Sequence, residues 1–251
     1  MKLADWSYPL WIAHRGAGKL APENTLAAFR VGAAHGYRAF ECDVKLSADG
    51  VPFLLHDATL QRTTPEHGPA CERPWSELSR LDAGGWHSRA FAGEPLPSFD
   101  AIAHYCIRNG FALNIEIKPT PGQNDETGRV VAQHAASLWA DETFKPLLSS
   151  FQPDALAAVR AAEPSLPRAL LLDSLRAGWL AEAQALECVA VVVDARLLDA
   201  SVIDQVHAAG LRVASYTVNE ADEAQRLLGA GIDSLITDAV DRFSPGSSVQ
   251  A

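Results

Sequence analysis

Four short apolar runs of this chain end in residues that could perform chemistry together. The ends are His14-Arg15-Gly16, Glu41-Cys42-Asp43, His56-Asp57 and Glu116-Ile117-Lys118. Residues two apart in a strand point to the same side, so Glu41 and Asp43 share one side, and Glu116 shares a side with Lys118 in the same way. Three carboxylates packed together repel one another unless a cation joins them. The pattern therefore predicts a divalent metal ion with two histidines beside it, a set of groups suited to cleaving a phosphate ester.

The acids of Glu41-x-Asp43 need a partner for their charges. The residues that alternate with these two acids are apolar, so the acids are expected to face inward. One candidate partner is a divalent metal ion, and the other is a structural ion-pair network with Arg15 and Lys118. We favour the metal ion because clustered carboxylates are typical ligands of hard cations.

His14 and His56 are the candidate proton carriers. Histidine titrates near neutral pH, which suits acid–base chemistry. A plainer alternative for His56 is a hairpin histidine whose ring lies in solvent. Asp57 orients a ring, positions the insertion or is a solvated loop residue. Tyr216 either lines the mouth of the site or packs in the core.

Alternating apolar runs and amphipathic stretches are expected to position these residues. The expected strands are residues 10–13, 39–44, 112–117, 147–150, 168–172, 189–193, 212–216 and 234–237. The expected helices are residues 24–34, 99–108, 127–139, 153–162, 175–183, 200–209 and 221–228. Asn24, Gln152-Pro153, Asp199 and Asn219 are the expected start signals of four of these helices.

Eight strands with helices between them predict an α/β protein with a (β/α)8 TIM-barrel fold. An open doubly wound sheet is the alternative, but no GxGxxG motif follows the first strand. We expect residues 1–251 to form a single barrel domain. Residues 57–98 are rich in Gly and Pro and are expected to form an insertion subdomain after the second strand, over the barrel mouth. The candidate residues lie at the C-terminal ends of the strands, where barrel enzymes place their active sites.

Composition limits the partners and the location of the protein. The 251 residues carry a formal net charge of -10 at pH 7 and no basic stripe, which argues against a nucleic-acid partner. The first residues lack the apolar segment of a signal peptide, and no apolar run reaches the roughly 20 residues of a membrane span. We therefore expect a cytoplasmic protein without stable membrane insertion. The four scattered cysteines are expected to be free thiols.

Together, these motifs resemble those of the glycerophosphodiester phosphodiesterase family (GDPD), bacterial cytosolic type. They are His14-Arg15-Gly16, Pro22-Glu23-Asn24-Thr25, Glu41-x-Asp43, His56-Asp57, Glu116-x-Lys118 and Thr237-Asp238, with Asp57-Ala-Thr-Leu-x-Arg-Thr-Thr64, Leu81-Asp82-Ala83-Gly84-Gly85-Trp86 and Pro95-Leu96-Pro97-Ser98 in the insertion. Two departures are Tyr216, where the family often has Trp, and Ala239-Val240, where it often has Pro soon after the final Thr-Asp.

The resemblance implies a TIM barrel that hydrolyses a small-molecule glycerophosphodiester to sn-glycerol 3-phosphate and an alcohol, a reaction of glycerol and lipid metabolism. It implies one divalent cation, calcium or magnesium, with the metal ligands Glu41, Asp43 and Glu116. It also implies acid–base roles for His14 and His56 and phosphate contacts for Arg15 and Lys118. Tyr216 could alter the pocket for the glycerol or the alcohol.

Three alternatives stay open at this point. The protein could be a lysophospholipase D or phospholipase C-like phosphodiesterase on the same scaffold, a non-catalytic phosphodiester-binding protein, or an unrelated barrel whose acids form structural ion pairs. The sequence does not distinguish calcium from magnesium, the acid from the base among the histidines, or water from the glycerol 2-hydroxyl as nucleophile. It also leaves open the alcohol head group and whether the protein is a homo-oligomer.

Overall fold

Eight parallel strands form a closed barrel in the computed structural model, which describes residues 3–243 and 245. The strands are β1 (Trp11–Ala13), β2 (Ala39–Leu46), β4 (Ala112–Ile117), β5 (Leu147–Ser150), β6 (Arg168–Leu172), β7 (Ala190–Asp194), β8 (Arg212–Tyr216) and β9 (Ser234–Thr237). They pair in the order β1-β9-β8-β7-β6-β5-β4-β2, and pairing of β1 with β2 closes the ring. The predicted TIM barrel is confirmed.

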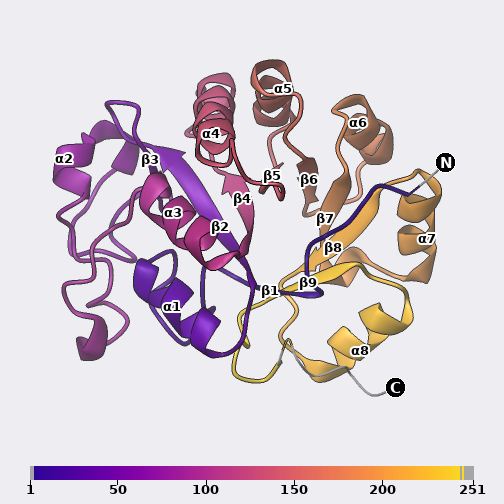
Figure 1. Cartoon of the computed structure of the whole chain (residues 1–251), viewed down its shortest axis with the longest axis horizontal. Helices are drawn as coiled ribbons and strands as arrows, with labels where there is room; N and C mark the ends of the chain where they lie inside the picture. Colours follow the sequence, from indigo (N-terminus) through magenta and orange to yellow (C-terminus); the bar gives the residue numbers. More distant parts are fainter. Residues whose placement is uncertain (1–2, 244, 246–251) are drawn as a thin grey trace.

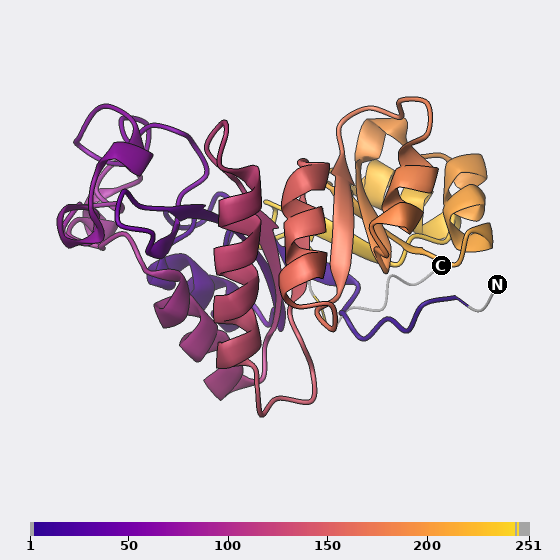
Figure 2. The same cartoon turned by 90° about the horizontal axis from the view of Figure 1, so that it is seen from above.

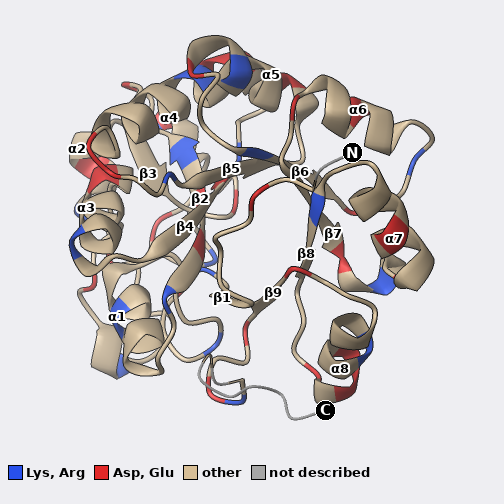
Figure 3. Ribbon diagram, turned by 45° about the vertical axis from the view of Figure 1, so that its right-hand side comes forward, with Lys and Arg blue, Asp and Glu red and all other residues tan. Residues whose placement is uncertain are grey.

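Seven helices of the described chain surround the barrel, as Figures 1 and 3 show. They are α1 (Leu26–Ala34), α3 (Phe99–Asn109), α4 (Asn124–Leu138), α5 (Pro153–Ala162), α6 (Trp179–Ala185), α7 (Ala200–Ala208) and α8 (Ala221–Gly229). Acidic and basic residues are spread over these outer helices and the loops in Figure 3. Within the described part of the chain, none of the helices has both the length and the apolar character needed to cross a bilayer.

Local signals explain several helix boundaries and correct three expectations. Pro153 opens α5 and the Asp199 side chain caps α7, as predicted. Gly178 adopts a left-handed conformation (φ 84°) directly before α6, which therefore begins later than the expected residue 175. The side chain that caps α1 is that of Thr25 rather than Asn24, and the residue at the N-cap of α8 is Glu220 rather than Asn219.

The barrel strands bury side chains on both faces, which explains why several are apolar throughout. Along β7, Val191 and Val193 belong to the core between the barrel and the helices, whereas Ala190 and Val192 belong to the core inside the barrel. Cys42 lies in the outer core, as its place between Glu41 and Asp43 predicts. Trp6 and Tyr8 pack against the inner core near the start of β9, where the Trp6 indole N–H donates to Ser234 Oγ.

A ninth strand and a long connection follow β2. β3 (Pro52–Leu54) pairs antiparallel with the end of β2, which extends past the expected residue 44 to Leu46. The chain from β3 to α3, which is described throughout, contains only the short helices α2 (Trp75–Leu78), η1 (Ala70–Glu72) and η2 (Arg89–Phe91). It has a hydrophobic cluster of its own around Phe53, Leu60 and Leu78, and it projects from one side of the barrel in Figure 2. His56 lies two residues after the end of β3, and the Leu55 N–H donates to the Asp43 carbonyl, which holds His56 beside β2.

Candidate active site

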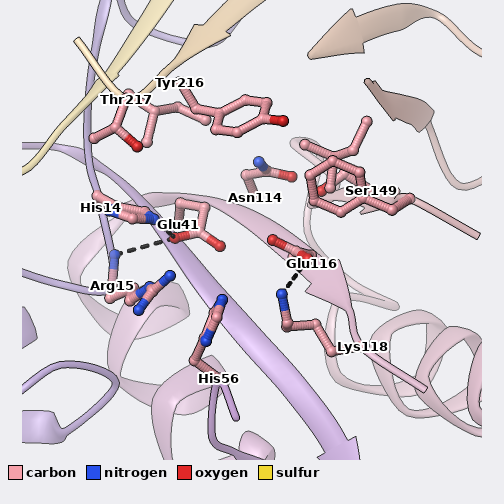
Figure 4. Close-up of a pocket in the computed structure, with 13 residues that line it drawn as sticks. His14, Arg15, Glu41, His56, Asn114, Glu116, Lys118, Ser149, Tyr216 and Thr217 are labelled. Atoms are coloured by element: carbon pink, nitrogen blue, oxygen red, sulfur yellow. Dashed lines mark hydrogen bonds and ion pairs between the residues drawn. The ribbon is translucent and has the colours of Figure 1, made fainter. Parts of the chain in front are cut away.

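A cavity of about 210 Å³ lies at the C-terminal ends of the strands, where TIM barrels carry their active sites. Figure 4 shows its lining, which consists of His14, Arg15, Glu41, His56, Asn114, Glu116, Lys118, Ser149, Phe151, Leu171, Tyr216, Thr217 and Ile236. The candidate proton carriers, metal ligands, phosphate-contacting residues and Tyr216 all line this cavity except Asp43. The Asp43 carboxylate is buried and lies within 3.3 Å of Arg15 Nε and 3.6 Å of Lys118 Nζ, both from lining residues.

Three carboxylates meet at the junction of β2 and β4. Asp43 is paired with Glu116 across the two strands, and Glu41 precedes Asp43 on the same side of β2. One oxygen from each of the three carboxylates lies within 4.8 Å of the others. Glu41 Oε1 and Asp43 Oδ1 are buried and accept no hydrogen bond from any described residue. Three converging carboxylates, two of which have a buried oxygen that accepts no hydrogen bond from the described chain, fit a hard divalent cation such as Ca²⁺ or Mg²⁺.

Arg15 and Lys118 compensate part of this negative charge. The Lys118 ammonium donates to Glu116 Oε1 at 2.9 Å. Burial disfavours the charged form of Asp43, but the charges of Arg15 and Lys118 outweigh it and lower the pKa of this carboxyl. Burial and the charge of Asp43 instead raise the pKa of Glu41 to about 8. The ion pairs therefore leave Glu41 without full compensation, which favours a bound cation over a purely structural network.

Each of the two histidines is oriented by an aspartate. His14 Nδ1 lies 2.6 Å from Asp238 Oδ1, and His56 Nδ1 lies 2.7 Å from Asp57 Oδ1. A carboxylate at Nδ1 fixes the ring and leaves Nε2 to exchange protons. Asp57 thus contacts the His56 ring and also Arg62 of the insertion, which agrees with two of the alternatives for this residue and not with a solvated loop aspartate. The pairing of Asp238 with His14 was not anticipated, although Thr237-Asp238 was among the recognised motifs.

The two histidines have different electrostatic surroundings. Burial disfavours the charged His14 ring, but the hydrogen bond to Asp238 and the charge of Glu41 raise its pKa overall. Burial lowers the pKa of His56 despite the attraction of Asp43. Asp57 also accepts two hydrogen bonds from Arg62, at 2.6 and 3.0 Å, so its charge is shared between His56 and Arg62.

Arg62 and Glu23 tie the connection after β3 to the loop after β1. Both terminal nitrogens of Arg62 donate to the Glu23 carboxylate at 2.7 Å, and Arg15 donates to the same carboxylate at 2.9 Å. A continuous chain of hydrogen bonds therefore runs from His56 through Asp57, Arg62 and Glu23 to Arg15. Glu23 and Arg62 both stand in recognised motifs, but only the folded chain brings them together.

Two neutral polar side chains also line the cavity, and the sequence patterns assigned a role to neither of them, although Ser149 stands near the end of an expected strand. Asn114 on β4 and Ser149 on β5 are buried, and Asn114 Oδ1 and Ser149 Oγ have no hydrogen-bond partner among the described residues. Leu171, Ile236 and Phe151 are the apolar part of the lining. The sequence signal was an Asn two residues before Glu116, and therefore on the same face of an otherwise apolar strand.

Comparisons with known proteins agree with this geometry. The model of the glycerophosphoryl diester phosphodiesterase family matches residues 14–242. A glycerophosphodiester phosphodiesterase of Caldanaerobacter subterraneus is 30% identical over 234 residues, which cover 91% of this chain and 93% of the relative.

Solved structures show the same similarity. A phosphodiesterase of Oleispira antarctica, solved in complex with the product sn-glycerol-3-phosphate, has a TM-score of 0.87 at 30% identity, with 94% of this chain and 95% of that chain covered. A glycerophosphodiester phosphodiesterase of Agrobacterium tumefaciens has a TM-score of 0.79 at 27% identity, with 97% of this chain and 99% of that chain covered. These matches exclude an unrelated barrel, and the chain therefore belongs to the glycerophosphoryl diester phosphodiesterase family of enzymes.

Proposed function

We propose that this enzyme hydrolyses glycerophosphodiesters to sn-glycerol 3-phosphate and an alcohol. The observation that carries the proposal is a cluster of three carboxylates at one cavity, two of them in its lining, beside two aspartate-oriented histidines. The Oleispira antarctica relative, which was solved with sn-glycerol-3-phosphate, supports the same product for this chain.

Glu41, Asp43 and Glu116 are the proposed ligands of one divalent cation, calcium or magnesium. When bound, the cation supplies positive charge that offsets the negative charge growing on the phosphoryl oxygens. Arg15 and Lys118 add fixed positive charge from the cavity wall for the remaining oxygens of the phosphate. Their ion pairs with Asp43 and Glu116 hold both side chains in place before substrate binds.

His14 and His56 are the proposed proton carriers. One accepts the proton of the nucleophile, and the other donates a proton to the leaving oxygen of the alcohol. Asp238 and Asp57 hold the Nδ1 side of each ring, so that Nε2 of each ring can carry these protons.

We propose the glycerol 2-hydroxyl as the nucleophile, because a tethered group gains effective concentration. Its oxygen bonds to phosphorus as the bond to the alcohol breaks, and water then opens the cyclic phosphate to give the monoester. A diester that lacks this hydroxyl should therefore be cleaved far more slowly, and equal rates on the two diesters would rule the hydroxyl route out.

The direct test is the release of glycerol 3-phosphate from glycerophosphocholine and glycerophosphoethanolamine, with and without EDTA. We expect metal-dependent release, and we expect it to be lost in His14→Ala and in Glu41→Ala. The matched control is His104→Ala, which removes an exposed histidine from α3. Failure of the wild-type enzyme to release the product from either diester in calcium or magnesium would contradict the proposal.

A further inference from the structure

The inner part of the cavity contains two polar groups that the proposed phosphate chemistry does not use. Asn114 is 2% exposed and Ser149 is fully buried, yet Asn114 Oδ1 and Ser149 Oγ have no partner among residues 3–243 and 245. Both residues belong to the cavity lining (Figure 4). A buried polar group without a partner costs about 1–3 kcal/mol, so a ligand that supplies the missing hydrogen bonds gains from each.

The neighbouring serine shows that this lack of partners is specific to the cavity side of β5. Ser150 is also fully buried, but it faces the other side of the strand. Its hydroxyl donates to the Ile117 carbonyl at 2.7 Å and accepts from the Gln152 N–H at 3.1 Å. The two adjacent serines on β5 therefore differ: the Ser150 hydroxyl has hydrogen-bond partners within the protein, whereas the Ser149 hydroxyl faces the cavity without one among the described residues.

The register of the strands places these groups one strand away from the carboxylates Glu41 and Glu116 of the proposed metal and phosphate site. Asn114 is paired with Glu41 across β2 and β4, and Ser149 is paired with Glu116 across β4 and β5. Adjacent strands lie about 4.8 Å apart, which is comparable to the distance from a phosphate oxygen to the hydroxyls of an attached glycerol. The two groups are neutral, and apolar Leu171 and Ile236 line the same cavity, which suits a small uncharged polyol rather than a second anion.

From this arrangement we infer that Asn114 and Ser149 bind the free hydroxyl groups of the glycerol moiety and make the enzyme selective for deacylated glycerophosphodiesters. The inference rests on the proposed function and names its substrate class. An acyl ester on a glycerol hydroxyl removes the O–H donor and adds bulk where the interior of the barrel is filled by Leu147, Ala169 and Ala190. A lysophospholipid is therefore a poor substrate of this site.

The test compares two ligands that differ only in the glycerol hydroxyls. The dissociation constants of sn-glycerol 3-phosphate and n-propyl phosphate are measured by calorimetry with the metal-loaded enzyme. We expect the wild-type enzyme to bind sn-glycerol 3-phosphate at least about tenfold more tightly. This preference should fall below about threefold in Asn114→Leu and in Ser149→Ala, because each variant removes a partner of a hydroxyl.

Ser150→Ala is the matched control, since it removes a satisfied hydroxyl from the same strand and should keep the tenfold preference. Ser149→Ala deletes one oxygen atom and keeps the test valid if Asn114→Leu does not fold. A tenfold preference retained in Ser149→Ala would overturn the assignment of Ser149, and one retained in both variants would overturn the inference. Loss of affinity for both ligands in equal proportion would indicate a structural role and overturn it as well.

A kinetic comparison tests the selection against acylated substrates. We expect kcat/KM for glycerophosphocholine to exceed that for lysophosphatidylcholine at least about 100-fold. Equal values would overturn the selectivity while leaving phosphodiester hydrolysis intact. A wild-type enzyme that binds sn-glycerol 3-phosphate but releases none from either glycerophosphodiester would instead contradict the proposed function, so the two failures are distinguishable.

Discussion

The two halves of the barrel interior differ in the polarity of their inward side chains near the C-terminal ends of the strands. The inner apolar core includes Ile12, Ala39 and Ala112 from the starts of β1, β2 and β4, but on β6 and β7 it reaches further along the strands, to Leu171 and Val192. Around β1, β2 and β4 the inward side chains at the strand ends include the acids Glu41, Asp43 and Glu116. Apolar burial stabilises the fold, whereas burial of like charges opposes it unless a partner is bound.

This contrast separates the residues that hold the barrel together from those that act at its mouth. In the apolar half, a smaller side chain leaves a cavity and weakens the fold. In the acidic half, burial and the charge of Asp43 raise the pKa of both Glu41 and Glu116, which shows that the fold by itself disfavours their charged forms. Substitutions in the apolar half should therefore lower stability and leave activity nearly unchanged. Substitutions in the acidic half should lower activity and leave stability unchanged or raise it.

The largest expected effect is the loss of a proton carrier. His56→Ala should lower kcat for glycerophosphoethanolamine by about 10²–10⁴-fold, the usual contribution of a positioned acid or base. The half-buried His56 ring contributes little to the core, so the midpoint of urea unfolding should change little. A near-normal kcat in this variant would show that His56 carries no proton in the reaction. The acidic half would then serve only to bind the metal ion and the phosphate.

Removal of the divalent cation should affect activity and stability together. EDTA should abolish turnover and lower the unfolding temperature, because an ion at about 100 times its Kd stabilises the native state by about 2.7 kcal/mol. Glu41→Gln should be inactive, yet without metal it should unfold at a higher temperature than the metal-free wild type, since it removes a poorly compensated buried acid. If the wild-type melting curve is the same with and without EDTA, the carboxylates form a structural ion-pair network instead.

Asp238→Asn should produce a smaller loss of activity. This variant replaces a charged hydrogen bond to His14 with a neutral one, and hydrogen bonds to charged groups contribute about 1.5–3 kcal/mol. The corresponding decrease in kcat is about 10–100-fold. The matched control is Asp241→Asn, which makes the same change at an exposed position a few residues later and should keep kcat near the wild-type value. Equal kcat in the two variants would show that His14 needs no orienting carboxylate.

The smallest expected effect on activity comes from the apolar half. Val192→Ala should lower the free energy of unfolding by about 2 kcal/mol, from two lost methyl groups and the cavity they leave. Its kcat/KM should stay within about threefold of the wild-type value, because Val192 does not line the active-site cavity. Urea unfolding and steady-state kinetics measure both quantities. A large loss of kcat/KM with no loss of stability would show that the apolar half also contributes to catalysis.

The sequence by itself determined the repeating strands and the residues at their ends. The strands β4, β5, β6, β8 and β9 have the predicted boundaries, because a buried parallel strand is a continuous apolar run between polar turns. The same pattern places Glu41 and Asp43 on one face, since side chains alternate along a strand whatever surrounds it. These features depend on neighbours within a few residues.

Only the tertiary structure decided which polar side chains act together. Asn24 and Asn219 looked like helix caps, but Asn24 bonds to Asp43 at 2.8 Å and Asn219 bonds to Asp238 at 3.2 Å. A polar side chain forms its hydrogen bond with whichever partner the fold brings within reach. The residues around an asparagine look the same whether it caps a helix or contacts the site. His14 and Asp238 are 224 positions apart, and they meet because closure of the barrel pairs β1 with β9.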